Sequence, residues 1–129
     1  MSNYQHIKRG WLTFGEKKIY LRSAWEAKYA SYLQALKTRK VIQDWDYEPE
    51  TFWFEGIKRG CVSYKPDFRV VDDDGSIFWV EVKGYMDAKS KTKIKRFKKY
   101  FPDQKLVVID SDWFRKNSKK LAWFCNACV

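Results

Sequence analysis

An apolar stripe at helical spacing is the first clear pattern along the chain. Residues three or four apart lie on one face of a helix, so such a stripe marks the side that packs against a core. The stripe consists of Trp25, Tyr29, Leu33 and Leu36. Ser23 precedes it and belongs to the residue types that cap helix starts. The pattern therefore predicts a helix over residues 23–39.

Short apolar runs bounded by turn residues predict strands in the middle of the chain. These runs cover residues 41–47, 52–55, 68–71 and 77–83. A turn is expected over residues 56–60, which begin and end with glycine. The last two runs are joined by Asp-Asp-Asp-Gly, which is typical of a hairpin turn. Residues 11–21 alternate loosely around Gly15 and predict a short strand pair or an extended arm.

The remaining pattern adds two helices and one strand. Asp87 opens a helix expected over residues 88–100, and Pro102 stops it. A buried strand over residues 106–110 and a final helix over residues 112–120 follow. The order of helix, three or four strands, helix, strand and helix predicts an α/β fold, in which helices flank one mixed central β-sheet.

Length and composition limit the organisation, the partners and the location. The 129 residues predict one domain, with an N-terminal arm or strands, a core, and a C-terminal helix and tail. These parts cover residues 1–21, 22–110 and 111–129. The net charge of +10 favours nucleic acid as a partner, and a generically basic soluble protein is the alternative. Without a membrane-spanning run or a signal peptide, the chain is expected in the cytoplasm, or in the host cytoplasm if a phage encodes it.

The strand expected over residues 77–83 ends in charges on an otherwise apolar face. Side chains alternate along a strand, so Glu81 and Lys83 share a face with Ile77 and Trp79. Charges on such a face are costly unless they are paired or used. A surface ion pair at the strand end is one interpretation, and a functional site is the other.

The hairpin register brings a second carboxylate to Glu81. If Asp72 faces Ser76 across the turn, Asp67 falls opposite Glu81. Two carboxylates directly opposite repel each other, and a divalent cation between them reverses the sign of that interaction. Pro66 lacks an N–H, which suits a place where the strand leaves its ladder. The pair predicts a Mg²⁺ site, with Mn²⁺ able to substitute.

These residues resemble the motif of the PD-(D/E)XK nuclease superfamily. The motif residues are Pro66, Asp67, Glu81, Val82 and Lys83. Residues 22–26 resemble the helix that supplies an additional acidic residue in this superfamily. Residues 80–85 are similar to phage endonucleases and archaeal-type Holliday-junction resolvases, and the resemblance spans about residues 20–110. It implies one nuclease domain over residues 1–129 with a restriction-endonuclease-like core.

The resemblance implies a role for each site residue. Asp67 and Glu81 would bind Mg²⁺, helped by the Val82 carbonyl. Lys83 would orient the attacking water or offset charge on the phosphate, and Glu26 would complete the acidic site. The implied activity is that of a metal-dependent endodeoxyribonuclease that needs no small-molecule cofactor.

Glu26 also has a structural interpretation. Ser23 and Glu26 have the S-x-x-E spacing of a capping box, in which the Glu26 carboxylate closes the first turn of the helix. The spacing alone favours the cap, whereas the resemblance favours catalysis. Glu16 and Glu48 are the fallback candidates for the additional acid.

The helix expected over residues 88–100 has a surface of one charge sign. Ile94, Phe97 and Phe101 lie at core spacing, and no acidic residue follows Asp87 within the helix. A solvated amphipathic helix usually mixes signs, so its basic residues, with two from the turn at residues 56–60, are predicted to contact DNA phosphates. They are Lys89, Lys91, Lys93, Lys95, Arg96, Lys98, Lys99, Lys58 and Arg59.

The leading hypothesis is a Mg²⁺-dependent, structure-selective DNA endonuclease, namely a Holliday-junction resolvase acting as a homodimer on branched DNA. The alternatives are a phage or homing-type endonuclease that cuts duplex DNA, and a non-catalytic basic DNA-binding accessory protein. Residues 72–74 are expected to form a polar turn, and His6 a surface position. Cys125 and Cys128 have the spacing of half a zinc site, or of a reduced dithiol.

Overall fold

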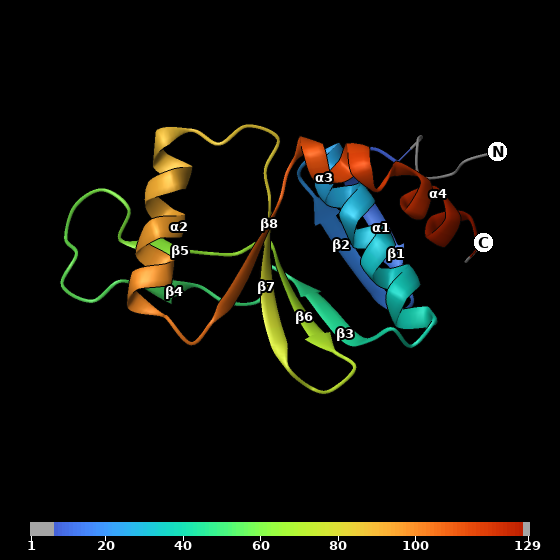
Figure 1. Ribbon diagram of the computed structural model, residues 1–129, viewed down its shortest axis with the longest axis horizontal. Helices are drawn as coiled ribbons and strands as arrows, with labels where there is room; N and C mark the ends of the chain where they lie inside the picture. Colours follow the sequence, from blue (N-terminus) through green and yellow to red (C-terminus); the bar gives the residue numbers. More distant parts are fainter. Residues whose placement is uncertain (1–6, 128–129) are drawn as a thin grey trace.

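The computed structural model describes residues 7–127, and their side chains up to residue 123. A four-stranded mixed sheet forms the centre, and helices pack on both of its faces (Figure 1). Its strands in spatial order are β3 (Ile42–Tyr47), β6 (Phe68–Asp72), β7 (Ile77–Val82) and β8 (Lys105–Ile109). β7 and β8 run parallel, whereas the other neighbours are antiparallel. The predicted mixed sheet flanked by helices is confirmed.

The two long helices begin where capping side chains predict. The helices are α1 (Ala24–Thr38), α2 (Ala88–Tyr100), α3 (Ser111–Lys116) and α4 (Ser118–Ala127). Ser23 caps α1 by accepting a hydrogen bond from the Glu26 N–H at 3.0 Å, and Asp87 caps α2 by accepting one from the Ser90 N–H at 2.7 Å. In the described part of the chain, every helix is too short or too polar to span a bilayer.

The C-terminal segment forms two helices where one was predicted over residues 112–120. α3 ends at Lys116 and is capped by Asn117, whose backbone N–H donates to the Trp113 carbonyl at 2.9 Å. The Asn117 side-chain amide donates to the same carbonyl at 2.8 Å, and α4 begins at the next residue. The prediction of one helix was wrong, because an asparagine side chain that bonds to nearby backbone favours a helix end over continuation.

Two hairpins lie outside the central sheet. β1 (Gly10–Phe14) pairs with β2 (Lys17–Leu21), which confirms a strand pair in the N-terminal region. β4 (Phe52–Trp53) pairs with β5 (Ser63–Tyr64), and β5 contacts α2. The strand predicted over residues 52–55 is therefore shorter, and the chain leaves it through the turn at Gly56, which has a φ of 81°.

The central sheet separates two cores. Val80 and Phe68 pack with Leu33 of α1 in one core. Trp79 packs with Phe97 of α2 in the other. Successive residues of β7 thus enter different cores, as the two-residue period of a strand requires. Glu81, two residues after Trp79, therefore lies on the α2 side of the sheet.

The hairpin formed by β6 and β7 has the predicted register. Phe68 pairs with Val80, and the Asp72 N–H donates to the Ser76 carbonyl at 2.8 Å. The next position beyond the Phe68 pair places Asp67 opposite Glu81, because strand residues pair one to one. The predicted register of the hairpin is confirmed.

Candidate active site

A polar cavity of about 410 Å³ lies between the starts of α1 and α2, where β6 begins and β7 ends. Its lining residues are Arg22, Glu26, Glu48, Tyr64, Lys65, Asp67, Glu81, Val82, Lys83, Ser90 and Lys93. The five residues assigned from the sequence to catalysis or metal binding all belong to this lining. Segments more than fifty residues apart in the chain therefore meet in one place.

Asp67 and Glu81 are buried carboxylates, and hydrogen bonds from β7 and from the separate strand β5 hold them. Asp67 is 8% exposed, and Glu81 is 7% exposed. The Val82 N–H donates to Asp67 Oδ2 at 2.8 Å, and the Tyr64 hydroxyl donates to Glu81 Oε2 at 2.6 Å. Hydrogen bonds from rigid elements fix the direction in which each carboxylate points, so both groups are pre-oriented toward the cavity.

The surroundings of these carboxylates disfavour two negative charges. Burial, together with the carboxylates of Glu81 and Glu26, raises the pKa of Asp67 to about 8. Burial also raises the pKa of Glu81, although the Tyr64 hydrogen bond and the Lys83 ammonium oppose this shift. Carboxylates that share a buried site hold on to a proton unless another positive charge replaces it. A positive charge within the cavity would therefore reduce this repulsion.

We predict that Asp67→Asn makes the metal-free protein more stable at alkaline pH. The folded-state pKa of about 8 lies above the ordinary value of 3.8, so the stability contributed by Asp67 is lost as the pH rises through 8. Asparagine can still accept the Val82 N–H and carries no charge. In EDTA at about pH 9 the variant should melt at least about 3 °C above the wild type, as circular dichroism would show. The gap should close near pH 4, and equal melting at both values would contradict the prediction.

Glu26 forms hydrogen bonds at the start of α1 and also lines the cavity. Its N–H donates to Ser23 Oγ at 3.0 Å, which is one half of the predicted capping box. Its carboxylate Oε1 accepts from the Tyr47 hydroxyl at 2.9 Å and from the Arg22 N–H at 3.2 Å, one residue before the cap. The same buried carboxylate lies close enough to raise the pKa of Asp67. Both interpretations made from the sequence thus have a structural basis.

The two fallback acids lie in different places. Glu48 lines the cavity, forms an ion pair with Arg22, and donates its N–H to the Asp67 carbonyl at 2.8 Å. Its φ of 48° is uncommon for a residue with a side chain, and such conformations concentrate at functional sites. Glu16 is exposed in the turn between β1 and β2, outside the cavity lining. Only Glu48 therefore remains a candidate for a further acidic site residue.

Several lining residues were not predicted from the sequence. Tyr64 and Lys65 directly precede the Pro-Asp pair, and this proximity was the available signal. Ser90 is buried in the first turn of α2 and gave no signal of its own. Lys93 was assigned to a DNA-facing surface, but it is half-buried and lies three residues after Ser90, on the same side of the helix. Its ammonium partly opposes the rise that burial causes in the pKa of Glu81.

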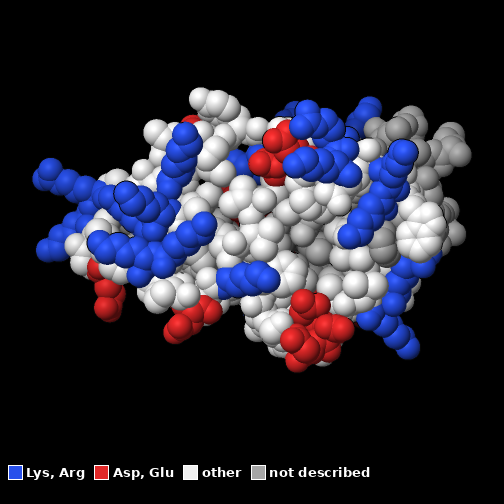
Figure 2. Space-filling view, viewed as in Figure 1, with Lys and Arg blue, Asp and Glu red and all other residues white. Residues whose placement is uncertain are grey.

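The exposed side of α2 is basic. Figure 2 shows Lys and Arg side chains gathered over α2 and the neighbouring loop, at one end of the molecule. The exposed members of the predicted set are Lys58, Arg59, Lys89, Lys91, Lys95, Lys98 and Lys99. Arg96 is half-buried and donates from Nη1 to the Cys61 carbonyl at 2.7 Å. It thus connects α2 to the segment between β4 and β5, a structural role that the sequence alone did not predict.

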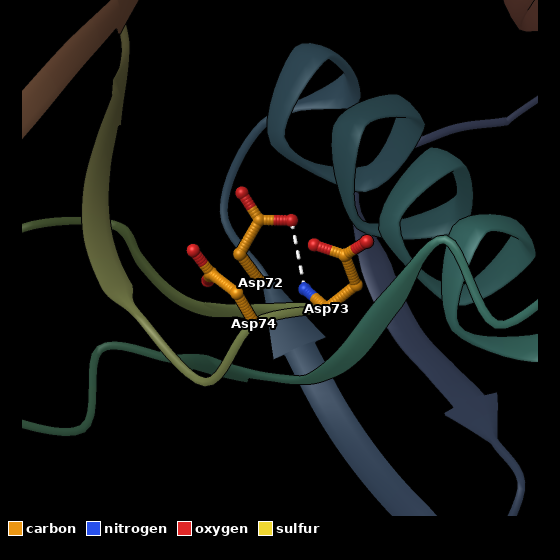
Figure 3. Close-up of side chains that lie close together, drawn as sticks. All are labelled: Asp72, Asp73 and Asp74. Carbon is orange, nitrogen blue, oxygen red and sulfur yellow. Dashed lines mark hydrogen bonds between the residues drawn. The ribbon is translucent and has the colours of Figure 1, made fainter.

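The acidic triplet at the turn between β6 and β7 is separate from the cavity. One carboxylate oxygen each from Asp72, Asp73 and Asp74 lies within 4.8 Å of the others (Figure 3). Asp72 Oδ1 accepts from the Asp73 N–H at 2.9 Å, and Asp74 Oδ1 accepts from the Ser76 N–H at 2.9 Å. These bonds match the predicted polar turn. Among the described residues no other such trio is as close, so the three carboxylates of the cavity are more widely spread.

The cysteine and histidine predictions fall mostly beyond the described region. His6 and Cys128 lie outside the described residues, and so does the Cys125 side chain. The half zinc site therefore stays a prediction. Cys61 is a buried free thiol in the segment between β4 and β5.

Fold and site together define an α/β protein with a buried acidic cavity beside a basic helix. The family described as "Protein of unknown function (DUF1064)" matches residues 4–121, and the chain belongs to this family. Neither a curated protein nor a solved structure matches the chain.

Proposed function

We propose that this protein is a Mg²⁺-dependent endonuclease that hydrolyses phosphodiester bonds in DNA. The observation that carries this proposal is the pair of buried carboxylates, Asp67 and Glu81, which line the same polar cavity. Burying two like charges side by side lowers stability, so their presence favours a function that uses them. Strongly perturbed carboxyl groups in a cavity are typical of functional sites.

The donors of the cavity fit a hard divalent cation. Asp67 and Glu81 supply carboxylate oxygens, and Val82 supplies a backbone carbonyl in the same lining. Mg²⁺ prefers oxygen ligands and retains several waters, so two carboxylates and one carbonyl leave positions for water and for a phosphate oxygen. These three residues would hold the ion, and Mn²⁺ accepts the same donors. When bound, such an ion lowers the pKa of a water molecule and offsets charge on the phosphate.

Residues of the chain itself supply orientation and positive charge. Lys83 lines the cavity, and its ammonium is near enough to oppose the rise that burial causes in the pKa of Glu81. A cation in this place stabilises the negative charge that develops as water adds to phosphorus and the strand oxygen leaves as a hydroxyl. Tyr64 donates to Glu81 and keeps that carboxylate directed into the cavity. The chemistry thus rests on charge and position, and no covalent intermediate is required.

A restriction-endonuclease-like core is the finer form of the fold that we propose. α1 is followed by β3, by the hairpin of β6 and β7, and then by α2 and β8. The intervening β4 and β5 form a sheet of their own. The Pro-Asp pair precedes β6, and the Glu-Val-Lys segment ends β7, so both parts of the motif reach the same cavity. This arrangement supports the resemblance to the PD-(D/E)XK superfamily.

Within this class we propose a cytoplasmic Holliday-junction resolvase that acts as a homodimer. Two symmetric cuts across a branch need two active sites, and two copies of the chain would supply two acidic cavities. The similarity of residues 80–85 to archaeal-type resolvases supports this choice. The basic side of α2 would hold the DNA backbone, because phosphate contacts position a duplex without reading its sequence.

Cleavage of branched, flapped and linear DNA by the purified protein tests the proposal. We expect Mg²⁺-dependent cuts at symmetric positions of a four-way junction and no cuts in EDTA. Cutting of linear duplex as fast as of the junction would favour the duplex-cutting alternative. Binding of all three substrates, without cleavage in Mg²⁺ or Mn²⁺, would overturn the nuclease proposal and leave the DNA-binding accessory protein.

We predict that neutralising the exposed side of α2 weakens the salt dependence of DNA binding. Lys95, Lys98 and Lys99 are exposed on this helix. Each phosphate contact contributes about 0.9 to the slope of log K against log salt on duplex DNA. Replacing all three with Gln should therefore reduce the slope by about 2 to 3, as measured by fluorescence anisotropy in EDTA.

A second triple variant serves as the matched control. Lys116, Lys119 and Lys120 are exposed on α3 and α4, and their replacement with Gln removes the same charge from another part of the surface. The slope of log K against log salt for this control variant should stay close to that of the wild type. Equal losses in both triple variants would show that net charge sets the affinity. An unchanged slope for the α2 variant would mean that this helix does not contact the DNA.

A further inference from the structure

The outer face of the hairpin formed by β1 and β2 carries two exposed aromatic residues. Packing in the core does not account for their presence. Trp11 and Tyr20 pair across the hairpin, with 63% and 47% of their surfaces exposed. Their ring centroids lie 5.4 Å apart in an edge-to-face arrangement. The inner face carries Phe14 and Leu21, which are buried in the core beside α1. Burial therefore accounts for one face of the hairpin and not for the other.

Cations and a groove adjoin the aromatic pair. The Lys18 ammonium lies 5.4 Å from the centroid of the Trp11 ring, and Lys8 and Arg9 are exposed directly before β1. Residues 7–14 line a groove of about 510 Å³ together with Ser31 of α1. The acidic residue of the hairpin, Glu16, lies in the turn at its far end. Aromatic rings flanked by cations are the combination that binds unpaired nucleic-acid strands.

We propose that this outer face binds single-stranded DNA by stacking bases on its rings. The hairpin surface consists of Lys8, Arg9, Trp11, Lys18 and Tyr20. The inference rests on the proposed nuclease function and adds that its branched substrate exposes unpaired nucleotides near the cut. β2 ends at Leu21, and the next residue, Arg22, lines the acidic cavity. Tyr20 lies two residues from Arg22, about 7 Å along an extended strand, so one strand can reach both places.

Charge and base exposure favour this occupant over two others. A dimer through this face would place the same patch of each copy against itself, which brings like charges from both copies together. A continuous duplex offers its phosphates, but its bases are stacked inside and cannot cover the rings. An unpaired strand offers phosphates to the cations and base faces to the rings at once.

Binding to labelled oligonucleotides in EDTA tests this inference without cleavage. The probes are an oligo-dT strand of about 20 nucleotides and an abasic strand with the same number of phosphates. Trp11→Leu and Tyr20→Leu remove a ring from an exposed position and keep an apolar side chain. Each should bind oligo-dT at least about fivefold more weakly than the wild type and bind the abasic strand equally well. Trp11→Phe should retain most of the oligo-dT affinity.

Trp53→Leu is the matched control for these variants. Trp53 is 65% exposed, and its strand β4 lies at the opposite end of the molecule from the hairpin (Figure 1). The Trp53→Leu variant should bind the oligo-dT strand and the abasic strand as tightly as the wild type does. Unchanged oligo-dT binding in both hairpin variants would overturn the inference. So would equal losses on the two strands, or the same loss from Trp53→Leu.

The nuclease proposal and the hairpin inference fail in different ways. Weaker oligo-dT binding by the hairpin variants, with no cleavage of any DNA in Mg²⁺, would contradict the nuclease proposal alone. Cleavage of DNA by a protein whose hairpin variants bind oligo-dT normally would contradict the hairpin inference alone.

Discussion

Asp67→Asn and Glu81→Gln should each reduce Mg²⁺-dependent cleavage of DNA at least about a hundredfold. Each change keeps the shape of the side chain and an oxygen for its hydrogen bond, from the Val82 N–H or from the Tyr64 hydroxyl. Each removes one negative charge that would hold the cation. Single-turnover cleavage of a labelled four-way junction measures the effect.

DNA binding by these two variants should be retained or become tighter. A carboxylate near a phosphate repels it, so its neutralisation favours the complex. Anisotropy with the same junction in EDTA separates this effect from the chemistry. If a variant lost both DNA binding and cleavage, a damaged fold, and not a missing metal ligand, would explain its inactivity.

Asp73→Asn is the matched control for the carboxylate variants. Asp73 is exposed in the turn between β6 and β7, so its replacement removes a carboxylate from the same hairpin and leaves the cavity intact. It should cleave at the wild-type rate. Full activity of Asp67→Asn or Glu81→Gln would refute the site assignment. Inactivity of Asp73→Asn would instead direct attention to the acidic triplet of the turn.

Glu26→Gln should lower cleavage about 10- to 100-fold while leaving the melting temperature nearly unchanged. The glutamine oxygen can accept the bonds from the Tyr47 hydroxyl and the Arg22 N–H, so the helix start keeps its contacts. What is lost is a negative charge beside Asp67. Cleavage rates and thermal melts of the same preparation test both halves of this expectation.

Ser23→Ala is the converse control. It removes the oxygen that accepts the Glu26 N–H, so it should cost about 1 kcal/mol of stability and leave most of the cleavage. Normal cleavage by Glu26→Gln would mean that Glu26 serves only the start of α1 and has no role in catalysis. Glu48 would then be the next candidate for the third acid, because it lines the cavity and Glu16 does not.

Local interactions explain why several features could be predicted from the sequence. Ser23 and Asp87 cap helices through bonds to residues three positions later, so the signal lies within a single turn. The hairpin register follows from the length of its turn, so a short stretch of sequence is enough to place Asp67 opposite Glu81. The mixed sheet followed from the order of these elements along the chain.

Contacts between distant segments determine the features that could not be predicted from the sequence. The two-residue β4 pairs with β5 outside the central sheet, and Arg96 bonds to the Cys61 carbonyl, because α2 packs beside this segment. Lys93 lies four residues before Phe97, on the packed side of the helix, but neither its spacing nor that of Arg96 indicates a partner. Their partners come from other parts of the chain, which a local pattern does not encode.

For the cavity, too, the sequence predicts some features and the tertiary structure determines the others. Residue types and spacing were enough to select Asp67, Glu81 and Lys83 as a group. Only the tertiary structure adds Tyr64 as the donor to Glu81 and places Glu26 close enough to raise the pKa of Asp67. A pKa depends on burial and on charges that arrive from separate elements, so it exists only once the chain has folded.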